Sequence, residues 1–406
     1  MVTGTEVLEG RVRDENGGAV AASLASAGVQ VERITVVGDG LDDIRAAVRE
    51  ALDADPDLLV TTGGLGPTHD DRTMEAVALA TGRPLHVDPH ALVMVRHALA
   101  AVPARSSEAA REEGARKQAT MPEGATVIPP PGTAPGAVVQ ADRTVVVVLP
   151  GPPWECRAAW DRAREVPAVA AVASGGHAGA PVEIRMAGVV ESEFMEALAG
   201  HDHEHAGLVV GVCARPGELE VTVRPPGEAA VAFVEYLDLR FPRAIFSRDG
   251  AGVEQVVGAL LSEAGATAGT AESCTGGMVG ARLTQVPGSS SWFRGGVVAY
   301  SNAVKQSVLG VPAAMIDAHG AVSEPVAQVM AEGALSALDC DWAVGITGVA
   351  GPGGGTADKP VGLVYVAVAG PSGAFVRELR LHGDRERVRM RASTIALHLL
   401  REALSA

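Results

Sequence analysis

The sequence has few aromatic residues, no paired cysteines and no long apolar run. Aromatic residues make up 3% of the 406 residues, so Ala, Val and Leu must build the hydrophobic cores. The four cysteines are far apart and form no CxxC pair, which argues against a disulfide framework or a zinc ribbon. No apolar run reaches the roughly 18–20 residues that cross a bilayer. The chain also lacks a basic cluster and has a net charge of −16, which argues against nonspecific binding to nucleic acid.

Lysine is rare in this chain. Only three of the 33 basic residues are lysines, namely Lys117, Lys305 and Lys359. A desolvated lysine can act as a base near neutral pH, whereas arginine stays protonated. The bias favours Lys305 as a catalytic base, with a surface cation as the alternative.

The chain is long enough for more than one hydrophobic core. Its 406 residues predict two or three domains, and the 47% hydrophobic composition is that of a soluble globular protein. The first residues, MVTGTEVLEGRVRDENG, form neither a signal peptide nor a transit peptide. We therefore expect a cytoplasmic protein with no membrane partner.

Strands and helices alternate in the first part of the chain, and strands such as TVVVVLPGPP are continuous apolar runs. This pattern predicts a doubly wound α/β domain over residues 1–172. Within it, the Pro- and Gly-rich segment 115–143 predicts an ordered loop with one short strand. Partly alternating strands predict a small α+β domain over 173–250, and a further α/β domain is expected over 251–406.

The sequence TTGGLGPTHDD is the first candidate site, and it follows a predicted strand. Its glycines allow a tight turn that presents N–H groups, and its paired acids stand where the next helix is expected to start. Such a loop suits a phosphate or pyrophosphate, with one carboxylate holding a divalent cation. An ordinary glycine turn with an Asp N-cap is the alternative, which the paired acids make less favourable. The residues concerned are Gly63, Gly64, Gly66, Asp70 and Asp71.

Two further acids are expected at the same edge of the sheet. Glu6 lies in GTEVLEG and Asp39 lies in VGDG. Open α/β sheets bind ligands at the carboxyl ends of their strands. Both side chains are therefore expected near the glycine turn.

The segment AESCTGGMVG is the second candidate site. Ser273 follows a short strand and precedes two glycines and a helix, a geometry that exposes a hydroxyl and aims N–H groups at an anion. A strand-like run then leads to Tyr300 and Lys305. Lys305 can deprotonate Ser273 if burial or Tyr300 lowers the pKa of the lysine.

Cys274 is the rival nucleophile in this segment, but no histidine is close to it in sequence. The structural alternative makes Ser273 a helix N-cap and Cys274 a small core residue. Both interpretations stay open at the level of the sequence.

Two weaker signals complete the survey. The run ITGVAGPGGGTADKPVG predicts a strand that opens into a glycine loop, which could close over a substrate or cradle a phosphate. The run HDHEH at 201–205 has three histidines and two acids. Its spacing is more typical of a solvated surface segment than of a tetrahedral metal site.

These motifs together resemble those of the CinA family (competence/damage-inducible protein A), and the resemblance covers nearly all of the chain. The molybdopterin-binding-like N-terminal domain of that family is matched by GTEVLEG, VGD, TTGGLGPTHDD, MPEGA, GTAPG and LPGPPWE. Its small KH-like middle domain is matched by AGVVES and the strands that follow. Its C-terminal nicotinamide-nucleotide amidohydrolase domain is matched by AESCTGG, PGSSSWFRGGVVAYSN, KQSVLGV, HGAVSEPVA, GITGVAGPGGG and KPVGLVY.

The resemblance implies that the C-terminal domain hydrolyses nicotinamide mononucleotide to nicotinate mononucleotide and ammonia, in pyridine-nucleotide salvage, without a cofactor. It implies Ser273 as the nucleophile, Lys305 as its base and Tyr300 as a hydrogen-bonding partner. Backbone N–H groups of the Ser273 turn would hold the oxyanion or the phosphate. The implied substrate-binding residues are Glu272, Thr275, Gly276, Gly277, Gly348 and Gly351.

The resemblance also implies an ADP-ribose pyrophosphatase in the N-terminal domain, with a divalent metal (cobalt or magnesium) and potassium. The implied ligand-binding residues are Gly63, Gly64, Gly66 and Asp70, and the implied metal ligands are Asp39, Asp71 and Glu6. The family normally has several more residues before the Gly-Thr-Glu motif than the three found here. We therefore expect a longer native start and a weaker pyrophosphatase site.

Two other functions fit parts of the sequence. A molybdopterin-binding or adenylylating protein would explain TTGGLGPTHDD but not the motifs of residues 270–362. A non-enzymatic competence factor would act through partners, and the acidic charge disfavours direct binding to DNA. Family precedent suggests a homodimer.

Overall fold

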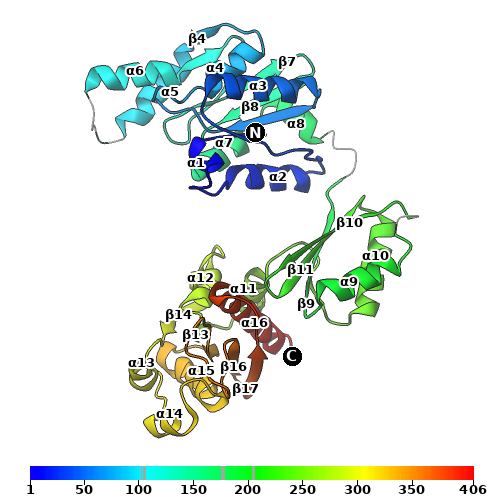
Figure 1. The fold of residues 1–406 in the computed structure, drawn as a ribbon, viewed down its shortest axis with the longest axis vertical. Coiled ribbons are helices and arrows are strands. Elements are labelled where there is room, and N and C mark those ends of the chain that lie inside the picture. Colours follow the sequence, from blue (N-terminus) through cyan, green and yellow to red (C-terminus); the bar gives the residue numbers. More distant parts are fainter. Residues whose placement is uncertain (102, 104–106, 175–178, 204–205) are drawn as a thin grey trace. The chain divides into compact units, whose positions relative to one another are not determined.

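The computed structural model describes residues 1–406 except 102, 104–106, 175–178 and 204–205 (Figure 1). The chain forms two compact units, Met1–Pro181 and Val182–Ala406. The first contains a six-stranded and a two-stranded sheet, and the second contains a four-stranded and a five-stranded sheet. The α/β fold class is confirmed, whereas the division at residues 172 and 250 stays a prediction. No helix of the described residues is long and apolar enough to span a membrane.

The six-stranded sheet of the first unit has a parallel half and an antiparallel half. Its strands are β1 (Val2–Thr3), β2 (Val36–Val37), β3 (Leu58–Thr62), β6 (Thr126–Ile128), β7 (Gly136–Ala141) and β8 (Thr144–Leu149). The strand order is β2-β1-β3-β8-β7-β6. The first four strands run parallel, whereas β7 is antiparallel to both of its neighbours.

Helices cover both faces of this sheet, as the continuous apolar strands predicted. Val146 and Val148 of β8 pack against α3, α4 and α5, and Val145 and Val147 pack against α2, α7 and α8. This two-sided burial explains why β8 is buried at every residue. The helices are α1 (Thr5–Leu8), α2 (Asn16–Ser26), α3 (Leu41–Asp53), α4 (Thr73–Ala80), α5 (Pro89–Ala100), α6 (Glu108–Gln118), α7 (Pro153–Ala163) and α8 (Pro167–Ser174).

The prediction of one short strand between residues 115 and 143 was wrong. The segment contains the end of α6, then β5 (Thr120–Pro122), β6 and β7, and β5 pairs with β4 (Leu85–Val87). Its prolines and glycines mark turns between short strands, and the strands are stabilised by pairing with residues far away in sequence.

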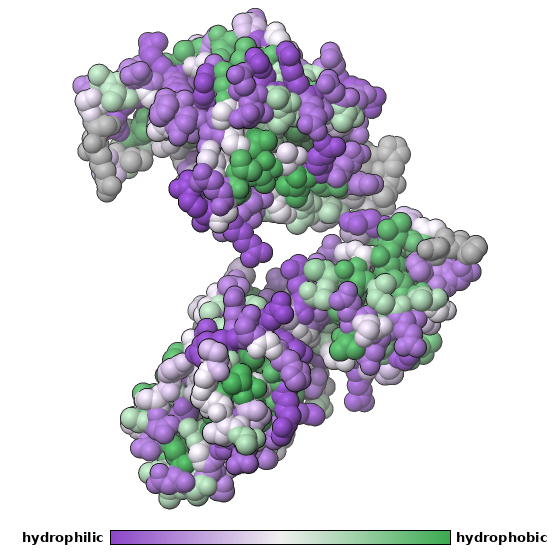
Figure 2. Space-filling view, viewed as in Figure 1, coloured by the Kyte–Doolittle hydropathy of each residue, from purple (hydrophilic) through white to green (hydrophobic). Residues whose placement is uncertain are grey.

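The second unit begins with a four-stranded antiparallel sheet and two helices. The strands are β9 (Val182–Ala187), β10 (Val209–Arg215), β11 (Glu218–Arg224) and β12 (Ile245–Ser247), in the order β10-β11-β9-β12. The helices are α9 (Glu191–Ala199) and α10 (Glu228–Arg240). Figure 2 shows hydrophobic residues on this part of the surface, where Val209, Val231 and Leu239 are exposed.

The five-stranded sheet carries the Ser273 segment. Its strands are β13 (Ala268–Glu272), β14 (Phe293–Val298), β15 (Trp342–Gly348), β16 (Leu363–Gly370) and β17 (Gly373–Arg380), in the order β14-β13-β15-β16-β17. β13 is parallel to both of its neighbours, so three carboxyl ends meet at one edge. The antiparallel strands β16 and β17 complete the sheet.

Helices again cover both faces of this sheet. One face packs against α11 (Val253–Ala264), α12 (Met278–Thr284) and α16 (Arg385–Leu404). The other packs against α14 (Ala313–His319) and α15 (Glu324–Leu338), and α13 (Asn302–Ser307) lies beside them. The edge with the carboxyl ends of β13, β14 and β15 therefore receives loops and helix starts from several distant segments.

Candidate active site

Ser273 and Lys305 meet at the carboxyl edge of the five-stranded sheet. Ser273 directly follows β13, and Lys305 lies on α13. The Lys305 Nζ donates a hydrogen bond of 2.9 Å to the Ser273 Oγ and another of 2.7 Å to the Ala299 carbonyl. The two side chains are thus within hydrogen-bond reach. The strand predicted to reach Lys305 ends at Val298, and a helix with Ser301 as its N-cap presents the lysine instead.

Burial changes the acid–base behaviour of Lys305. The residue is 2% exposed, and this burial lowers the pKa of its amine below the ordinary value of 10.5. Both of its hydrogen bonds go to neutral oxygens, and no carboxylate of the described residues forms an ion pair with it. The neutral amine is the form that can accept a proton. At a given pH, it therefore makes up a larger fraction of Lys305 than of an exposed lysine.

Cys274 has the environment of a core residue. It is 6% exposed and belongs to the hydrophobic cluster between the sheet and the helices α11 and α16. Burial raises the pKa of its thiol to about 11. The thiolate, which is the nucleophilic form, is therefore scarce near neutral pH.

The N–H groups at the start of α12 donate hydrogen bonds to another part of the protein. The Glu272 carboxylate, which is 1% exposed, accepts hydrogen bonds from the backbone of Gly277, Val279 and Gly280 at 2.9–3.1 Å. A buried carboxylate needs such donors, and here the helix start supplies them. Gly277 therefore does not offer a free N–H to a ligand as expected, and Glu272 anchors the turn from within the protein.

Two N–H groups beside Ser273 remain without an oxygen partner. The Gly276 N–H donates to the Ser273 carbonyl at 3.1 Å, so it is not free either. Within the described residues, the N–H groups of Cys274 and Thr275 donate to no protein oxygen and lie near the Cys274 sulfur, a weak acceptor. These two groups are the remaining backbone donors of the turn.

Arg389 on α16 was missed by sequence analysis. Its Nε donates to the Cys274 carbonyl at 3.1 Å and its Nη2 to the Thr275 carbonyl at 2.8 Å. The planar guanidinium thereby holds two successive carbonyls of the turn that carries Ser273. No local signal indicated this contact, because 114 residues separate Arg389 from Thr275.

Tyr300 has a different partner from the one expected. It is 61% exposed, and its hydroxyl accepts a hydrogen bond of 2.7 Å from Arg385, which also donates to the Gly351 carbonyl at 2.8 Å. The described residues show no hydrogen bond from the phenol to Ser273 or Lys305. Arg385 therefore connects Tyr300 to the glycine loop.

The glycine loop after β15 starts beside Ser273. The Ser273 N–H donates to the Ile346 carbonyl at 2.9 Å, which joins the ends of β13 and β15. Gly348 is the last residue of β15, and a Cβ there would lie 2.8 Å from the Leu363 carbonyl. Gly351 has a φ of 81°, a conformation that favours glycine. The loop thus starts two residues after the β15 residue that contacts Ser273, and Gly348 at its start packs closely against the backbone of β16.

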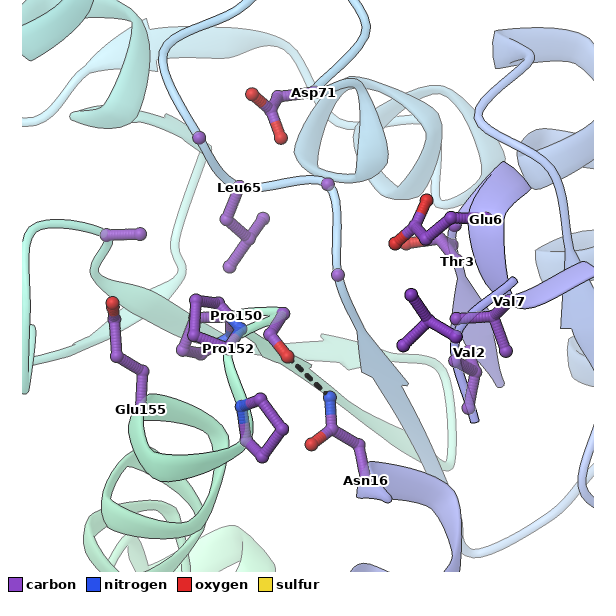
Figure 3. A pocket seen from close by; sticks show the side chains of 18 of the residues that line it. Val2, Thr3, Glu6, Val7, Asn16, Leu65, Asp71, Pro150, Pro152 and Glu155 are labelled. Carbon is purple, nitrogen blue, oxygen red and sulfur yellow. Dashed lines mark hydrogen bonds between the residues drawn. The ribbon is translucent and has the colours of Figure 1, made fainter. Parts of the chain in front are cut away.

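A separate cavity of about 510 Å³ lies in the first unit (Figure 3). It opens at the carboxyl ends of β1, β3 and β8, where the parallel half of the sheet was expected to bind a ligand. Gly63 has a φ of 100°, and a Cβ there would lie 2.3 Å from the Thr3 carbonyl, so only glycine fits. The lining includes all the predicted residues of this unit: Gly63, Gly64, Gly66, Asp70, Asp71, Asp39 and Glu6.

The paired acids of the glycine turn do not cap the next helix, so the alternative interpretation of an Asp N-cap is wrong. α4 begins at Thr73, and Asp70 and Asp71 lie in the turn before it. The Thr68 hydroxyl lies within hydrogen-bond distance of both carboxylates and shares its one proton between them, and the Thr68 N–H donates to Asp71 at 2.9 Å. The turn therefore satisfies these acids with its own donors.

The predicted metal ligands line one cavity but do not form a ligand set. The Asp39 carboxylate accepts from the Thr5 N–H at 2.9 Å. In the part of the chain that the structure describes, no three Asp, Glu, His or Cys side chains converge so that they could hold a metal ion. Asp39, Asp71 and Glu6 therefore do not fit a metal centre built by the protein alone, and the divalent metal and potassium stay predictions.

His201, the first residue of the histidine run, is less solvated than expected. The His201 ring packs against Phe233 and Tyr236, with ring centroids 4.9 and 4.7 Å away. Glu204 and His205 lie outside the described residues. Within the described part of the run, His201 therefore packs against the small core beside α10, whereas Asp202 is exposed.

Comparisons with known proteins agree with this organisation. The family model "CinA C-terminal domain" matches residues 251–404, and "Probable molybdopterin binding domain" matches residues 1–169. A CinA-like protein of Mycolicibacterium gilvum is 46% identical over 415 residues, covering 100% of this chain and 98% of the relative. A CinA-like protein of Mycobacterium marinum is 44% identical over 419 residues, with the same two shares.

Among solved structures, the competence/damage-inducible protein CihA of Agrobacterium tumefaciens is 38% identical. The match covers 38% of this chain and 96% of that one, with a TM-score of 0.36. The full-length relatives and the two family models lead to one conclusion: the chain belongs to the CinA family.

Proposed function

We propose that the second unit hydrolyses the carboxamide of nicotinamide mononucleotide to nicotinate mononucleotide and ammonia. Ser273 is the nucleophile and Lys305 is its base. The observation that carries this proposal is the 2.9 Å hydrogen bond between the buried Lys305 amine and the Ser273 hydroxyl. The choice of substrate follows the resemblance of AESCTGG and its neighbouring motifs to the amidohydrolase domain of the family.

The reaction has two halves that use the same pair. In the first, neutral Lys305 takes the proton of Ser273 while the Oγ attacks the amide carbon, and the lysine then protonates the departing nitrogen. Ammonia leaves and an ester to Ser273 remains. In the second half, Lys305 deprotonates a water molecule that attacks the ester, and nicotinate mononucleotide is released.

The tetrahedral oxygen of each half needs hydrogen-bond donors. We assign it to the N–H groups of Cys274 and Thr275, because Glu272 and the Ser273 carbonyl occupy the other N–H groups of the turn. Arg389 holds the carbonyls of the same two residues, which fixes their peptide planes. The phosphate of the substrate therefore has to bind outside this turn.

Ammonia and nicotinate mononucleotide release by wild type and Ser273→Ala tests the proposal. We expect a loss of at least about a thousandfold in kcat, because the variant has no nucleophile. Ser262→Ala is a matched control, since this α11 hydroxyl donates only to the Gly258 carbonyl. Full activity of Ser273→Ala would exclude Ser273 as the nucleophile.

We further propose that the cavity of the first unit binds ADP-ribose and supports its hydrolysis. The cavity volume of about 510 Å³ and the glycine turn at the sheet edge favour a nucleotide-sized ligand. This second activity is tested by the rate at which AMP and ribose 5-phosphate form from ADP-ribose, measured for the wild type and for Asp71→Asn. Lack of turnover in wild type with cobalt, magnesium and potassium present would contradict it.

The homodimer expected from family precedent is also a proposal. Sedimentation equilibrium of the full chain tests it, and a single species of 41.3 kDa would contradict it.

A further inference from the structure

Glu218 and His398 form a buried pair that neither proposed reaction uses. Glu218 is the first residue of β11 and is 7% exposed, and His398 lies on α16 and is 5% exposed. The His398 Nε2 lies 2.8 Å from the Glu218 Oε1, although 180 residues separate the two in sequence. An ionised carboxylate only accepts hydrogen bonds, so the Nε2 carries a proton and donates it. The pair therefore joins the four-stranded sheet to the last helix that covers the five-stranded sheet.

The surroundings of the pair are closely packed. Phe246 of β12 lies edge-on to the His398 ring, with the ring centroids 4.6 Å apart. A Cβ on Gly217, in the turn before β11, would lie 3.3 Å from the Thr394 Cγ2. The second carboxylate oxygen lies 3.6 Å from the Arg185 guanidinium. The four-stranded sheet thus contacts α16 through apolar and polar groups at one junction.

The same helix reaches the candidate active site. Near its start, Arg389 holds two carbonyls of the turn that carries Ser273. Between this contact and the buried pair, the Thr394 hydroxyl accepts a hydrogen bond of 2.8 Å from Arg282 of α12. Figure 1 shows α16 beside α11 and α12. His398 is nine residues after Arg389, about 14 Å along a helix, so one continuous helix links the pair with the turn.

The physical effect of such a pair is mainly directional. Removing two polar groups from water offsets most of their attraction, so apolar residues of similar volume would stabilise the junction about as well. Apolar surfaces can slide over one another, whereas a hydrogen bond fixes a distance and an angle. The pair therefore fixes how far α16 is rotated and shifted against β11. Arg389 is sensitive to such a shift, because its two hydrogen bonds are directional as well.

We propose that Glu218 and His398 are positioning residues for the amidohydrolase. They fix the register of α16 and, through Arg389, the geometry of the turn that carries Ser273. The four-stranded sheet is thereby a working part of the site, although none of its residues touches the reacting atoms. The effect on the reaction rate rests on the proposed function, whereas the effect on the turn does not.

Replacing both partners with apolar residues of similar volume, in Glu218→Met/His398→Leu, tests the inference in the full chain. Hydrogen–deuterium exchange of residues 268–284, which include the Ser273 turn, should become at least about threefold faster. Hydrolysis of nicotinamide mononucleotide should show kcat reduced about tenfold, with KM within about twofold of the wild-type value. The midpoint of urea unfolding should stay within about 0.5 M, because the apolar pair packs as well as the polar one.

Two control variants separate the hydrogen bond from other effects. Glu218→Gln keeps the volume and an oxygen that can accept from His398, so exchange and kcat should match the wild type. Asp238→Asn breaks the exposed ion pair between Asp238 and Arg248, which lies in the same small sheet-and-helix layer but away from α16. It should also match the wild type. Loss of kcat or faster exchange to the same extent in Glu218→Gln would contradict a role for the hydrogen bond.

The coupling to Arg389 has a test of its own. Arg389→Ala should lower kcat at least about tenfold in the wild type but less than about threefold in Glu218→Met/His398→Leu, where the positioning is already lost. Equal losses in the two backgrounds would show that the pair does not act through Arg389, and would overturn the inference.

Exchange of the Ser273 turn decides the inference independently of the reaction. If the wild type does not hydrolyse nicotinamide mononucleotide, the proposed function fails and exchange alone is read. Exchange as slow as in the wild type overturns the inference, and so does an unchanged kcat where the wild type is active. If the apolar pair does not fold, His398→Gln and His398→Asn replace it. The glutamine amide can reach Glu218 and the asparagine amide is one methylene too short, so equal exchange in these two variants overturns the inference as well.

Discussion

Replacing Lys305 with methionine separates the chemical role of the amine from its role in packing. Methionine has similar length and no charge, so the buried volume is nearly conserved. The variant loses the proposed base beside Ser273 and two hydrogen bonds, to the Ser273 hydroxyl and the Ala299 carbonyl. Activity and stability should therefore respond very differently.

The expected loss of activity is large. A general base contributes about 10²–10⁴ to the rate, which corresponds to about 3–5 kcal/mol of activation free energy. The stability effect is smaller because two terms oppose each other. The unpaired Ala299 carbonyl costs about 1–3 kcal/mol, whereas removal of an amine that is 2% exposed relieves a desolvation penalty. We expect the free energy of unfolding to change by less than about 2 kcal/mol at pH 7.

The dependence on pH has a definite sign. The pKa of Lys305 is lowered in the folded protein, so between that lowered value and 10.5 the unfolded chain binds more protons. The free energy of unfolding of the wild type should therefore rise with pH across this window, relative to that of Lys305→Met. Below the window both states are protonated, so the folded protein bears the full cost of burying the charged amine. The rising limb of kcat/KM should lie below 10.5 for the same reason.

Ammonia release and urea unfolding at several pH values measure these effects. Lys117→Met serves as a control, because it removes another of the three lysines from the other unit. Full activity of Lys305→Met would refute the role of the amine as base. A rising limb at or above 10.5 would refute the effect of burial on it.

Three further predictions follow from the turn that carries Ser273. Glu272→Gln leaves one acceptor for three N–H groups, so urea unfolding should show a loss of about 2–3 kcal/mol, whereas the exposed Glu332→Gln should be neutral. Cys274→Ala should keep kcat within about fivefold of the wild-type value, because a thiol with a pKa of about 11 is not ionised at neutral pH. In the wild type, iodoacetamide should label the exposed Cys213 before the buried Cys274. Arg389→Ala frees the two carbonyls that it holds, so steady-state kinetics should show kcat reduced at least about tenfold with little change in KM. An unchanged kcat would contradict a positioning role for Arg389.

Local patterns determined much of the fold. The continuous apolar strand β8 and the helices that alternate with the strands indicated a doubly wound sheet, since such runs are buried on both faces. The segment between α6 and β8 escaped the same reasoning. Its strands are three to six residues long and are stabilised by long-range pairing, which leaves no periodic signal in the sequence.

The sequence by itself determined which chemical groups the candidate sites could contain. The sequence shows a serine before two glycines and a rare lysine shortly afterwards. It also shows a glycine turn with paired acids. Residue type and local spacing are enough for this, because they fix which atoms can donate, accept or attack.

Only the tertiary structure decided how those groups are paired. In the folded chain the Lys305 amine donates a hydrogen bond to the Ser273 hydroxyl, and the N–H groups at the start of α12 donate to Glu272. Arg389 of the last helix donates to the turn that carries Ser273. The Tyr300 hydroxyl accepts a hydrogen bond from Arg385 and makes none with Ser273 or Lys305 among the described residues. The physical reason is that burial and hydrogen-bond partners depend on side chains from segments more than thirty residues apart, as in the Ser273–Lys305 contact itself, and local spacing does not encode them.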